Sequence, residues 1–231
     1  MEQKYESYTS EDFKVWELLY NRQIPALNNM ADPQWLEGLH RIGFVGDEIP
    51  RFTQVNQVLR KCTGWEIFVV PGLIPDKDFF ELLLNKQFPC STWLRKLEQL
   101  DYLQEPDMFH DVFAHVPLLT NQSYCDFLSG LAHIALDHIE DRWAIELLSR
   151  IYWFTIEFGL IRREEGLRIY GAGILSSKGE SYFCLEDPDV PRHPYEVGHI
   201  MDTPYIKSEF QKRYFVINAY EELYSSLDEI R

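Results

Sequence analysis

Two histidines and one glutamate in this 231-residue chain have the types and surroundings of metal ligands. His110 and His115 stand five positions apart just before Pro117, and Glu157 lies within the apolar segment 151–160. An ionised carboxylate left unpaired among apolar side chains costs several kcal/mol, so Glu157 needs a cation, a set of hydrogen bonds or a proton. A divalent metal ion would meet that need.

The spacing of the two histidines limits the kinds of metal site that they could form. On one α-helix, residues five apart point roughly 140° away from each other, so the two rings converge only if the helix ends between or just after them. Pro117 supplies that ending, because the residue before a proline is displaced from helical geometry. Two imidazoles and one carboxylate on one face of an octahedron are typical of a non-haem Fe(II) oxygenase. A histidine pair near a proline is nevertheless more often a helix cap with a partly buried ring.

The apolar pattern predicts the elements that must position these residues. A helix begins at Thr9-Ser10 and ends near Gln23, before Pro25. A long helix from about Glu140 to Arg163 carries Glu157, the stretch from Asp187 to Pro194 is a loop, and Tyr220 to Arg231 is a final helix. Further helices are expected at 33–43, 55–64, 76–84 and 121–136 and from Ser176, with short strands at 65–70, 87–89, 167–170 and 214–217. The chain is therefore expected to be mainly α with a few short strands (α+β).

Composition limits the classes of partner. With 45% hydrophobic residues, the chain can bury one large core, so residues 1–231 are expected to form a single compact domain. A net charge of −15 argues against binding nucleic acid or anionic membranes, which need clustered cations. The four cysteines have no CxxC spacing, and no apolar run approaches about 18 residues. We expect a cytoplasmic protein with reduced thiols, no membrane segment and no signal peptide.

Three ordered motifs carry a resemblance to a known family. They are PDxxHxxxxHVPL at 106–118, IYWFTIEFGL at 151–160 and YGAGILSS at 170–177. With them the chain resembles the pterin-dependent aromatic amino acid hydroxylases, from about Tyr8 to the C-terminus. The resemblance implies a minimal bacterial-type catalytic domain that lacks the family's N-terminal regulatory domain and C-terminal tetramerisation helix, so we expect a monomer or weak dimer.

The resemblance also implies roles for particular residues. The iron ligands would be His110, His115 and Glu157. The tetrahydropterin would meet the turn Val70, Gly72, Leu73, Ile74 and Asp76 with Phe79, and Asp111, Ser149 and Tyr152 from other segments. For the amino acid, Arg95 would pair with the substrate carboxylate, and Asp107 would hold Arg95 in place. The pocket for the substrate ring would be lined by Trp153, Phe158, Pro106 and Gly173. Ser176 would lie near the first iron ligand, His110.

Several positions depart from the family's pattern. Asp111 stands where the family has a glutamate, so its contact with the pterin is shorter by one methylene or mediated by water. Leu103 replaces a hydroxyl residue near the substrate carboxylate, and Pro89 and Lys207 fall where the family varies with substrate. A tryptophan at position 153 resembles the phenylalanine hydroxylases more than the tryptophan hydroxylases, which tend to have phenylalanine there.

The resemblance implies an Fe(II)- and tetrahydropterin-dependent monooxygenase that uses O2 to hydroxylate the ring of a free aromatic amino acid, with phenylalanine to tyrosine as the first expectation. Tryptophan 5-hydroxylation, or relaxed use of both amino acids, is the alternative within the class. A non-catalytic pterin- or metal-binding protein and a zinc hydrolase are the alternatives from other classes.

Overall fold

The computed structural model describes residues 1–101, 103 and 105–231. The chain opens with a long helix, α1 (Ser10–Met30), which begins in a capping box between Thr9 and Asp12. The predicted end near Gln23 is wrong, because Pro25 lies inside the helix. Proline removes one backbone hydrogen bond. Burial of Leu27 and Ala31 beyond it offsets that loss and carries the helix onward.

The next helices agree with the sequence pattern. The expected helices are confirmed as α2 (Pro33–Ile42), α3 (Phe52–Cys62), α4 (Asp76–Leu84) and α5 (Gln122–Asp137). Asp32 and Asn121 cap α2 and α5 by accepting hydrogen bonds from Gln34 N and Tyr124 N. Two strands lie between these helices, β1 (Glu66–Val69) and β2 (Gln87–Cys90), and they pair in parallel. Loop residues 70–74 follow β1 directly.

Both stretches with candidate metal ligands are wound as π-helices. The first is η3 (Phe109–His115), which continues into the 3-10 turn η4 (Val116–Thr120). The expectation that Pro117 ends the helix is wrong, since Val116 keeps helical angles (φ −63°, ψ −34°) and Pro117 lies in the first turn of η4. In a π-helix the hydrogen bonds run from i to i+5, so residues five apart share one face. The histidines therefore converge through the winding of their own helix.

The predicted helix from Glu140 to Arg163 is divided into three elements. These are α6 (Arg142–Tyr152), η5 (Trp153–Glu157) and the strand β3 (Gly159–Arg163). Gly159 allows the change, because a Cβ there would lie 2.2 Å from the Tyr170 ring. Leu160 and Ile161 are fully buried in the strand. Pairing with neighbouring strands thus overrides local helix propensity.

β3 belongs to a four-stranded mixed sheet in the order β4-β3-β6-β5. It pairs antiparallel with β4 (Gly166–Ile169) and parallel with β6 (Tyr214–Ile217). The loop predicted over 187–194 is wrong at its end, because β5 (Arg192–Pro194) pairs in parallel with β6. The predicted final helix is likewise divided, into α10 (Tyr220–Ser225) and α11 (Leu227–Ile230). The remaining helices are α7 (Ala172–Leu175), α8 (Lys178–Glu186), which Ser177 caps, and α9 (Val197–Met201).

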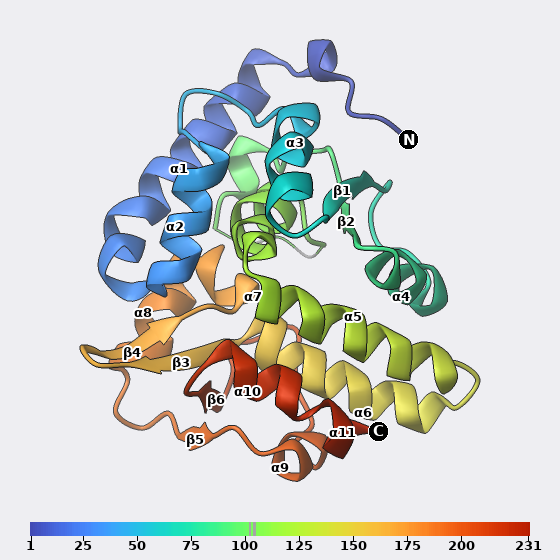
Figure 1. Ribbon diagram of the computed structural model, residues 1–231. Coiled ribbons are helices and arrows are strands. Elements are labelled where there is room, and N and C mark those ends of the chain that lie inside the picture. The colour runs from blue at the N-terminus through green and yellow to red at the C-terminus, as the bar shows by residue number, and fades with distance from the viewer. Residues whose placement is uncertain (102, 104) are drawn as a thin grey trace.

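Figure 1 shows how these elements surround the candidate ligands. Helices α1 to α3 form the upper part, α4 with β1 and β2 lies to the right, and α5 and α6 pack side by side below. The four-stranded sheet closes the lower left, and η3 contacts β2 and α7. Helical content dominates, so the expected mainly α architecture with short strands is confirmed.

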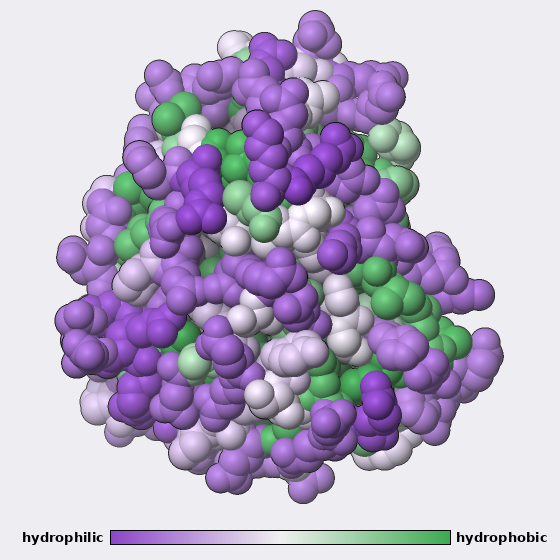
Figure 2. Space-filling view, in the orientation of Figure 1, coloured by the Kyte–Doolittle hydropathy of each residue, from purple (hydrophilic) through white to green (hydrophobic). Residues whose placement is uncertain are grey.

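Polar side chains cover most of the face seen in Figure 2, with the more hydrophobic surface at the right of the view around α5. Within the described residues, no helix combines the length and apolar character needed to cross a membrane.

Candidate metal centre and adjoining cavities

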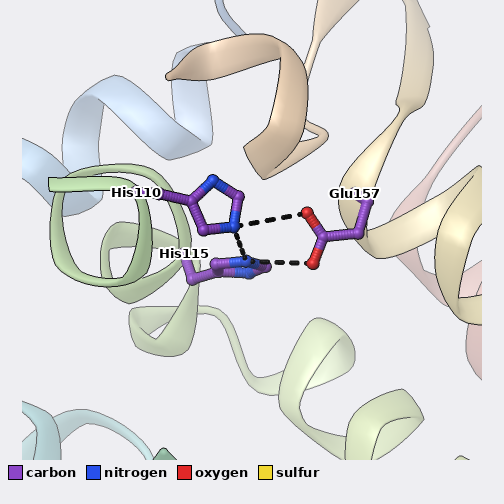
Figure 3. A group of neighbouring side chains, drawn as sticks. All are labelled: His110, His115 and Glu157. Carbon is purple, nitrogen blue, oxygen red and sulfur yellow. Dashed lines mark hydrogen bonds and ion pairs between the residues drawn. The ribbon is translucent and has the colours of Figure 1, made fainter. Parts of the chain in front are cut away.

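His110, His115 and Glu157, hereafter the metal triad, meet at one point in the structure (Figure 3). The Nε2 atom of His115 lies 3.2 Å from Nε2 of His110 and 3.2 Å from Glu157 Oε1. His110 Nε2 lies 3.5 Å from Glu157 Oε2. Within the described ranges, this is the one group of three or more His, Cys, Asp or Glu side chains with ligand atoms this close together.

These distances fit a first-row divalent ion. Donors at right angles and about 2.1 Å from such an ion lie about 3.0 Å from each other. The three donors are slightly farther apart than that, and they share one side of the ion. Two imidazoles and one carboxylate are also the donor set of non-haem iron sites that keep coordination positions open. The metal triad therefore fits a bound Fe(II) ion.

The protonation of His110 and Glu157 suits metal ligation. Burial lowers the pKa of the His110 imidazole to about 4, against the opposing effect of Glu157, so the ring is neutral near pH 7. Burial raises the pKa of the Glu157 carboxyl, but its interactions with the two imidazoles and with the Gly173 backbone outweigh burial and leave that pKa below its ordinary value. A neutral imidazole beside an ionised carboxylate is the form that binds metal.

Ser176 fixes the tautomer of His110. Its hydroxyl donates to Ala172 O at 2.9 Å, and its oxygen lies 2.9 Å from His110 Nδ1. Because the serine proton is already donated, the imidazole must donate from Nδ1. His110 Nε2 is then unprotonated and points toward the other two donors. In the part of the chain that the structure describes, the buried Nδ1 of His115 has no such partner.

The backbone holds the carboxylate in place. Glu157 is the last residue of η5, and β3 begins two residues later. A Cβ on Gly171 would lie 2.5 Å from the carbonyl oxygen of Glu157, so only glycine allows this approach. The YGAG turn that resembles the family motif thus packs directly against the glutamate.

Two cavities open onto the metal triad. The smaller has a volume of about 440 Å3, and all nine residues that the resemblance assigns to the pterin lie in its wall. These residues are Val70, Gly72, Leu73, Ile74, Asp76, Phe79, Asp111, Ser149 and Tyr152. Five further residues, for which no pterin contact was predicted, also line this cavity: Phe80, Phe88, Pro89, Tyr205 and Lys207. Of these, Phe88 and Pro89 on β2 could be inferred only from the pairing of β2 with β1.

Asp111 is a buried acid in the wall of the smaller cavity. It follows His110 directly, and its Oδ2 accepts a hydrogen bond from Ser91 N at 2.7 Å. Burial raises the pKa of the Asp111 carboxyl to about 7, although the Ser91 backbone N–H lowers it in part. The Phe79 ring packs edge-to-face on Tyr152, with ring centroids 5.5 Å apart. The cavity thus combines aromatic rings with the carboxyl groups of Asp76 and Asp111, besides that of Glu157.

The larger cavity, about 920 Å3, is lined by His110 and Glu157 of the metal triad. Six of the seven residues assigned to the amino acid line it, namely Arg95, Pro106, Trp153, Phe158, Gly173 and Ser176. Leu103 lines it as well. A Cβ on Gly173 would lie 2.6 Å from the Phe158 ring, so glycine lets that ring form the cavity wall.

The seventh residue, Asp107, lies behind the wall and pairs with Arg95. Nε and Nη2 of Arg95 donate to the two carboxylate oxygens, each at 2.9 Å. Asp107 also accepts from Arg95 N at 3.0 Å and His110 N at 3.1 Å. The pair is almost completely buried. Asp107 therefore fixes the guanidinium and the start of η3 together.

Glu180, for which no cavity role was predicted, lies on α8 in the wall of the larger cavity. Its Oε1 accepts from Gln211 N at 2.9 Å and from Tyr214 Oη at 2.8 Å. Burial raises its pKa to about 7, against the opposing effect of these two donors. An acid in a helix's first turn is ordinarily read as a favourable interaction with the helix dipole, which is why its burial was not foreseen.

Replacing Glu180 with glutamine should stabilise the fold at alkaline pH. Between pH 4.5 and about 7, the unfolded chain releases the proton and the folded chain keeps it, so stability falls as pH rises. Above pH 7 this loss reaches about 3 kcal/mol, and the neutral amide of E180Q, which still accepts both hydrogen bonds, avoids it. Urea unfolding at pH 5 and pH 8 measures the effect. An equal difference between variant and wild type at both pH values would contradict the prediction.

Comparisons with known proteins agree with this geometry. The sequence model of the family described as biopterin-dependent aromatic amino acid hydroxylase matches residues 4–230. The chain is 46% identical over 226 residues to the phenylalanine-4-hydroxylase of Ralstonia nicotianae, covering 98% of this chain and 72% of that protein. It is also 46% identical over 224 residues to the phenylalanine-4-hydroxylase of Chromobacterium violaceum, covering 97% and 75%.

Solved structures agree in fold. The phenylalanine hydroxylase of C. violaceum with bound oxidised Fe(III) superposes with a TM-score of 0.96 and 45% identity, covering 99% of this chain and 82% of that one. The same enzyme bound to cobalt gives a TM-score of 0.95, covering 98% and 82%. Sequence and fold thus match over nearly the whole chain, which belongs to the biopterin-dependent aromatic amino acid hydroxylase family.

Proposed function

We propose that this chain is an Fe(II)- and tetrahydropterin-dependent monooxygenase that converts free phenylalanine to tyrosine with O2. The observation that carries the proposal is the metal triad, whose three donors lie 3.2 to 3.5 Å apart between the two cavities. The relatives named phenylalanine-4-hydroxylase support the substrate, and the Fe(III)-bound C. violaceum structure supports the metal.

Each cavity has the chemistry of one reactant. Backbone groups of the turn from Val70 to Ile74 can pair with the polar edge of a pterin, and Phe79 offers a ring for stacking. Asp111, one methylene shorter than the family's glutamate, would reach the pterin through a water molecule. A bound ferrous ion and a reduced pterin together supply the electrons that activation of dioxygen requires.

The larger cavity suits an aromatic amino acid. Arg95 presents a buried guanidinium that Asp107 holds in one orientation, and a substrate carboxylate can pair with its remaining N–H groups. Trp153, Phe158 and Pro106 offer apolar surface for the ring. Leu103 offers no hydroxyl to the carboxylate, so Arg95 carries that interaction. Filling both cavities would displace water from around the metal triad and leave the substrate ring beside it.

We also infer the context of this reaction. Residues 1–231 act as one catalytic domain, with the amino acid, O2 and reduced pterin as the small-molecule partners. The net charge of −15 makes nucleic acid and anionic membranes unfavourable partners and favours solubility. The four free cysteines suit a reducing cytoplasm, and the resemblance to the family's minimal catalytic domain suits a monomer or weak dimer.

The decisive experiment loads the protein anaerobically with Fe(II), then adds O2, tetrahydropterin and a mixture of Phe, Trp and Tyr. Mass spectrometry of the products should find tyrosine formed from isotopically labelled phenylalanine. Hydroxytryptophan as the main product would favour the tryptophan 5-hydroxylase alternative, and both products a relaxed enzyme. Bound iron and pterin without any hydroxylated product would point to the non-catalytic binding protein. Hydrolysis that proceeds without O2 and pterin would point to a zinc hydrolase.

Ser176→Ala should weaken iron binding without unfolding the chain. The change removes the acceptor that keeps His110 protonated at Nδ1, and loss of such a partner typically costs about 10- to 100-fold in metal affinity. Competition with a chromophoric Fe(II) chelator measures the affinity. Ser123→Ala, on the exposed side of α5, is the matched control and should bind iron as the wild type does. Equal affinities of S176A and the control would disprove the role of Ser176.

A further inference from the structure

Gln211 is a buried residue with no role in the site described above. It ends the segment 205–211, which lies within the connection between α9 and β6. Its side chain donates from Nε2 to Ile206 O at 3.1 Å, and its Oε1 accepts from Trp153 Nε1 at 2.9 Å. Only 4% of its surface is exposed. A buried amide with its donors and acceptor satisfied is costly to disturb, because any group left unpaired keeps its desolvation penalty.

Trp153, which donates this hydrogen bond, belongs to the wall that the two cavities share. It lines both of them. Tyr205 stacks on the indole at a centroid distance of 4.3 Å and an interplanar angle of 16°, and Phe158 packs against it at 4.7 Å. Tyr205 and Gln211 are the two ends of one segment. That segment therefore holds the indole by its face at one end and by its N–H at the other.

The same segment covers the larger cavity. Lys207, Ser208, Glu209 and Phe210 line it between the two anchoring ends. Phe210 lies close against α8, where a Cβ on Gly179 would come within 2.7 Å of its ring. The backbone N–H of Gln211 donates to the buried carboxylate of Glu180. α8 thus packs against this segment and accepts a hydrogen bond from it, and the segment in turn contacts Trp153.

We propose that Gln211 is a positioning residue that sets the amino acid specificity of the enzyme by fixing the Trp153 indole between the pterin and amino acid cavities. The inference rests on the proposed function. Trp153 shares the larger cavity's wall with Phe158, so the orientation of its indole sets the space left for a substrate ring. An indole released from Gln211 can rotate and enlarge that space. Discrimination against a bulkier ring then falls, whereas iron binding does not depend on this hydrogen bond.

The test uses Gln211→Leu, which keeps the volume but removes the amide. We expect the KM for phenylalanine to rise about tenfold with a smaller change in kcat, because the loss of one partly buried hydrogen bond changes an equilibrium by about that factor. The preference for phenylalanine over tryptophan, as a ratio of kcat/KM values, should fall about tenfold. Tyr195→Phe is the matched control, since it removes a partly buried hydrogen bond to Ser226, and neither residue lines either cavity. It should leave KM and the preference unchanged.

A double-mutant cycle separates positioning from general destabilisation. Phenylalanine at position 153 has no N–H for Gln211 to accept, so Q211L should change KM less than about twofold in the W153F background. A tenfold rise in both backgrounds would show that Gln211 does not act through the indole and would overturn the inference.

A second readout does not depend on turnover. In NMR spectra, the indole N–H signal that disappears in W153F identifies Trp153, and its exchange with solvent should be roughly tenfold faster in Q211L. Unchanged exchange would refute the hydrogen bond and the inference with it. If the wild type forms no tyrosine but the indole N–H still exchanges faster in Q211L than in the wild type, the proposed function is refuted while the positioning of Trp153 by Gln211 stands. Active wild type with unaltered Q211L kinetics would overturn the inference alone.

Discussion

Replacing His110 with alanine should abolish iron binding and hydroxylation while the chain stays folded. His110 supplies one of three donors, and the Glu157 carboxylate and His115 cannot hold an Fe(II) ion as firmly by themselves. Loss of a ligand should cost more than the 10- to 100-fold typical of a residue that only supports a ligand. Because a metal supplies several kcal/mol of charge stabilisation, kcat/KM should fall about a thousandfold or more.

Iron content after gel filtration and tyrosine formation measure this effect, and circular dichroism reports the fold. His133→Ala is the matched control, because His133 is an exposed histidine on α5 whose side chain is 56% accessible. The control should keep both iron and activity. Stoichiometric iron with undiminished tyrosine formation in H110A would remove the metal triad as the centre of the reaction.

Replacing Arg95 with lysine should raise the KM for the amino acid about a hundredfold while iron binding is preserved. Arg95 uses two nitrogens to satisfy Asp107 and keeps further N–H groups for a substrate carboxylate. A lysine ammonium cannot match this planar geometry, and loss of a charged hydrogen bond costs about 1.5 to 3 kcal/mol. The buried carboxylate of Asp107 would also lose one of the two side-chain hydrogen bonds that offset the cost of burying its charge, so the midpoint of thermal unfolding should fall.

Steady-state kinetics with varied phenylalanine at saturating pterin separate KM from kcat. Arg41→Lys, in an exposed ion pair with Glu37, is the control for the arginine-to-lysine change and should behave as the wild type. An unchanged KM in R95K would place the substrate carboxylate elsewhere. A KM for pterin that rises as much as the KM for phenylalanine would contradict the assignment of Arg95 to the larger cavity.

The sequence predicted the regular helices well, because their signals are local. Caps at Thr9, Asp32 and Asn121 and the apolar periodicity after them give the starts of α1, α2 and α5. The ends that failed depend on distant residues. Pro25 is accepted inside α1 because of burial beyond it, and β3 replaces a predicted helix because β4 and β6 flank it. Neither neighbour can be read from the local pattern.

The candidate ligands were chosen correctly for proximity, but the reason given for their convergence was wrong. We expected an α-helix at these residues, and in an α-helix His110 and His115 diverge unless the helix ends. In the structure both η3 and η5 are π-helical, a rare form that local propensity does not signal. The apolar surroundings of Glu157 did indicate its need for a partner, since that argument depends on chemistry and not on winding.

Residues recruited by tertiary packing could not be predicted. Tyr205 and Gln211 come from an irregular segment, and their contacts with Trp153 cross about fifty positions of the chain. Glu180 presents the same difficulty, because an acid in the first turn of a helix usually faces water. Residues matched by family motifs were placed around the two cavities, whereas those outside any motif required the coordinates. The roles of both groups stay predictions until the variants above are measured.

The shared wall of the two cavities has a thermodynamic consequence. Leu73, Pro106, His110, Trp153, Glu157 and Lys207 line both. If one bound molecule shifts this shared wall, the affinity of the other cavity for its own ligand must change. Reciprocity then requires that each ligand change the binding free energy of the other by the same amount. Calorimetric titration of the amino acid with and without pterin, and of pterin with and without the amino acid, must therefore return the same coupling free energy.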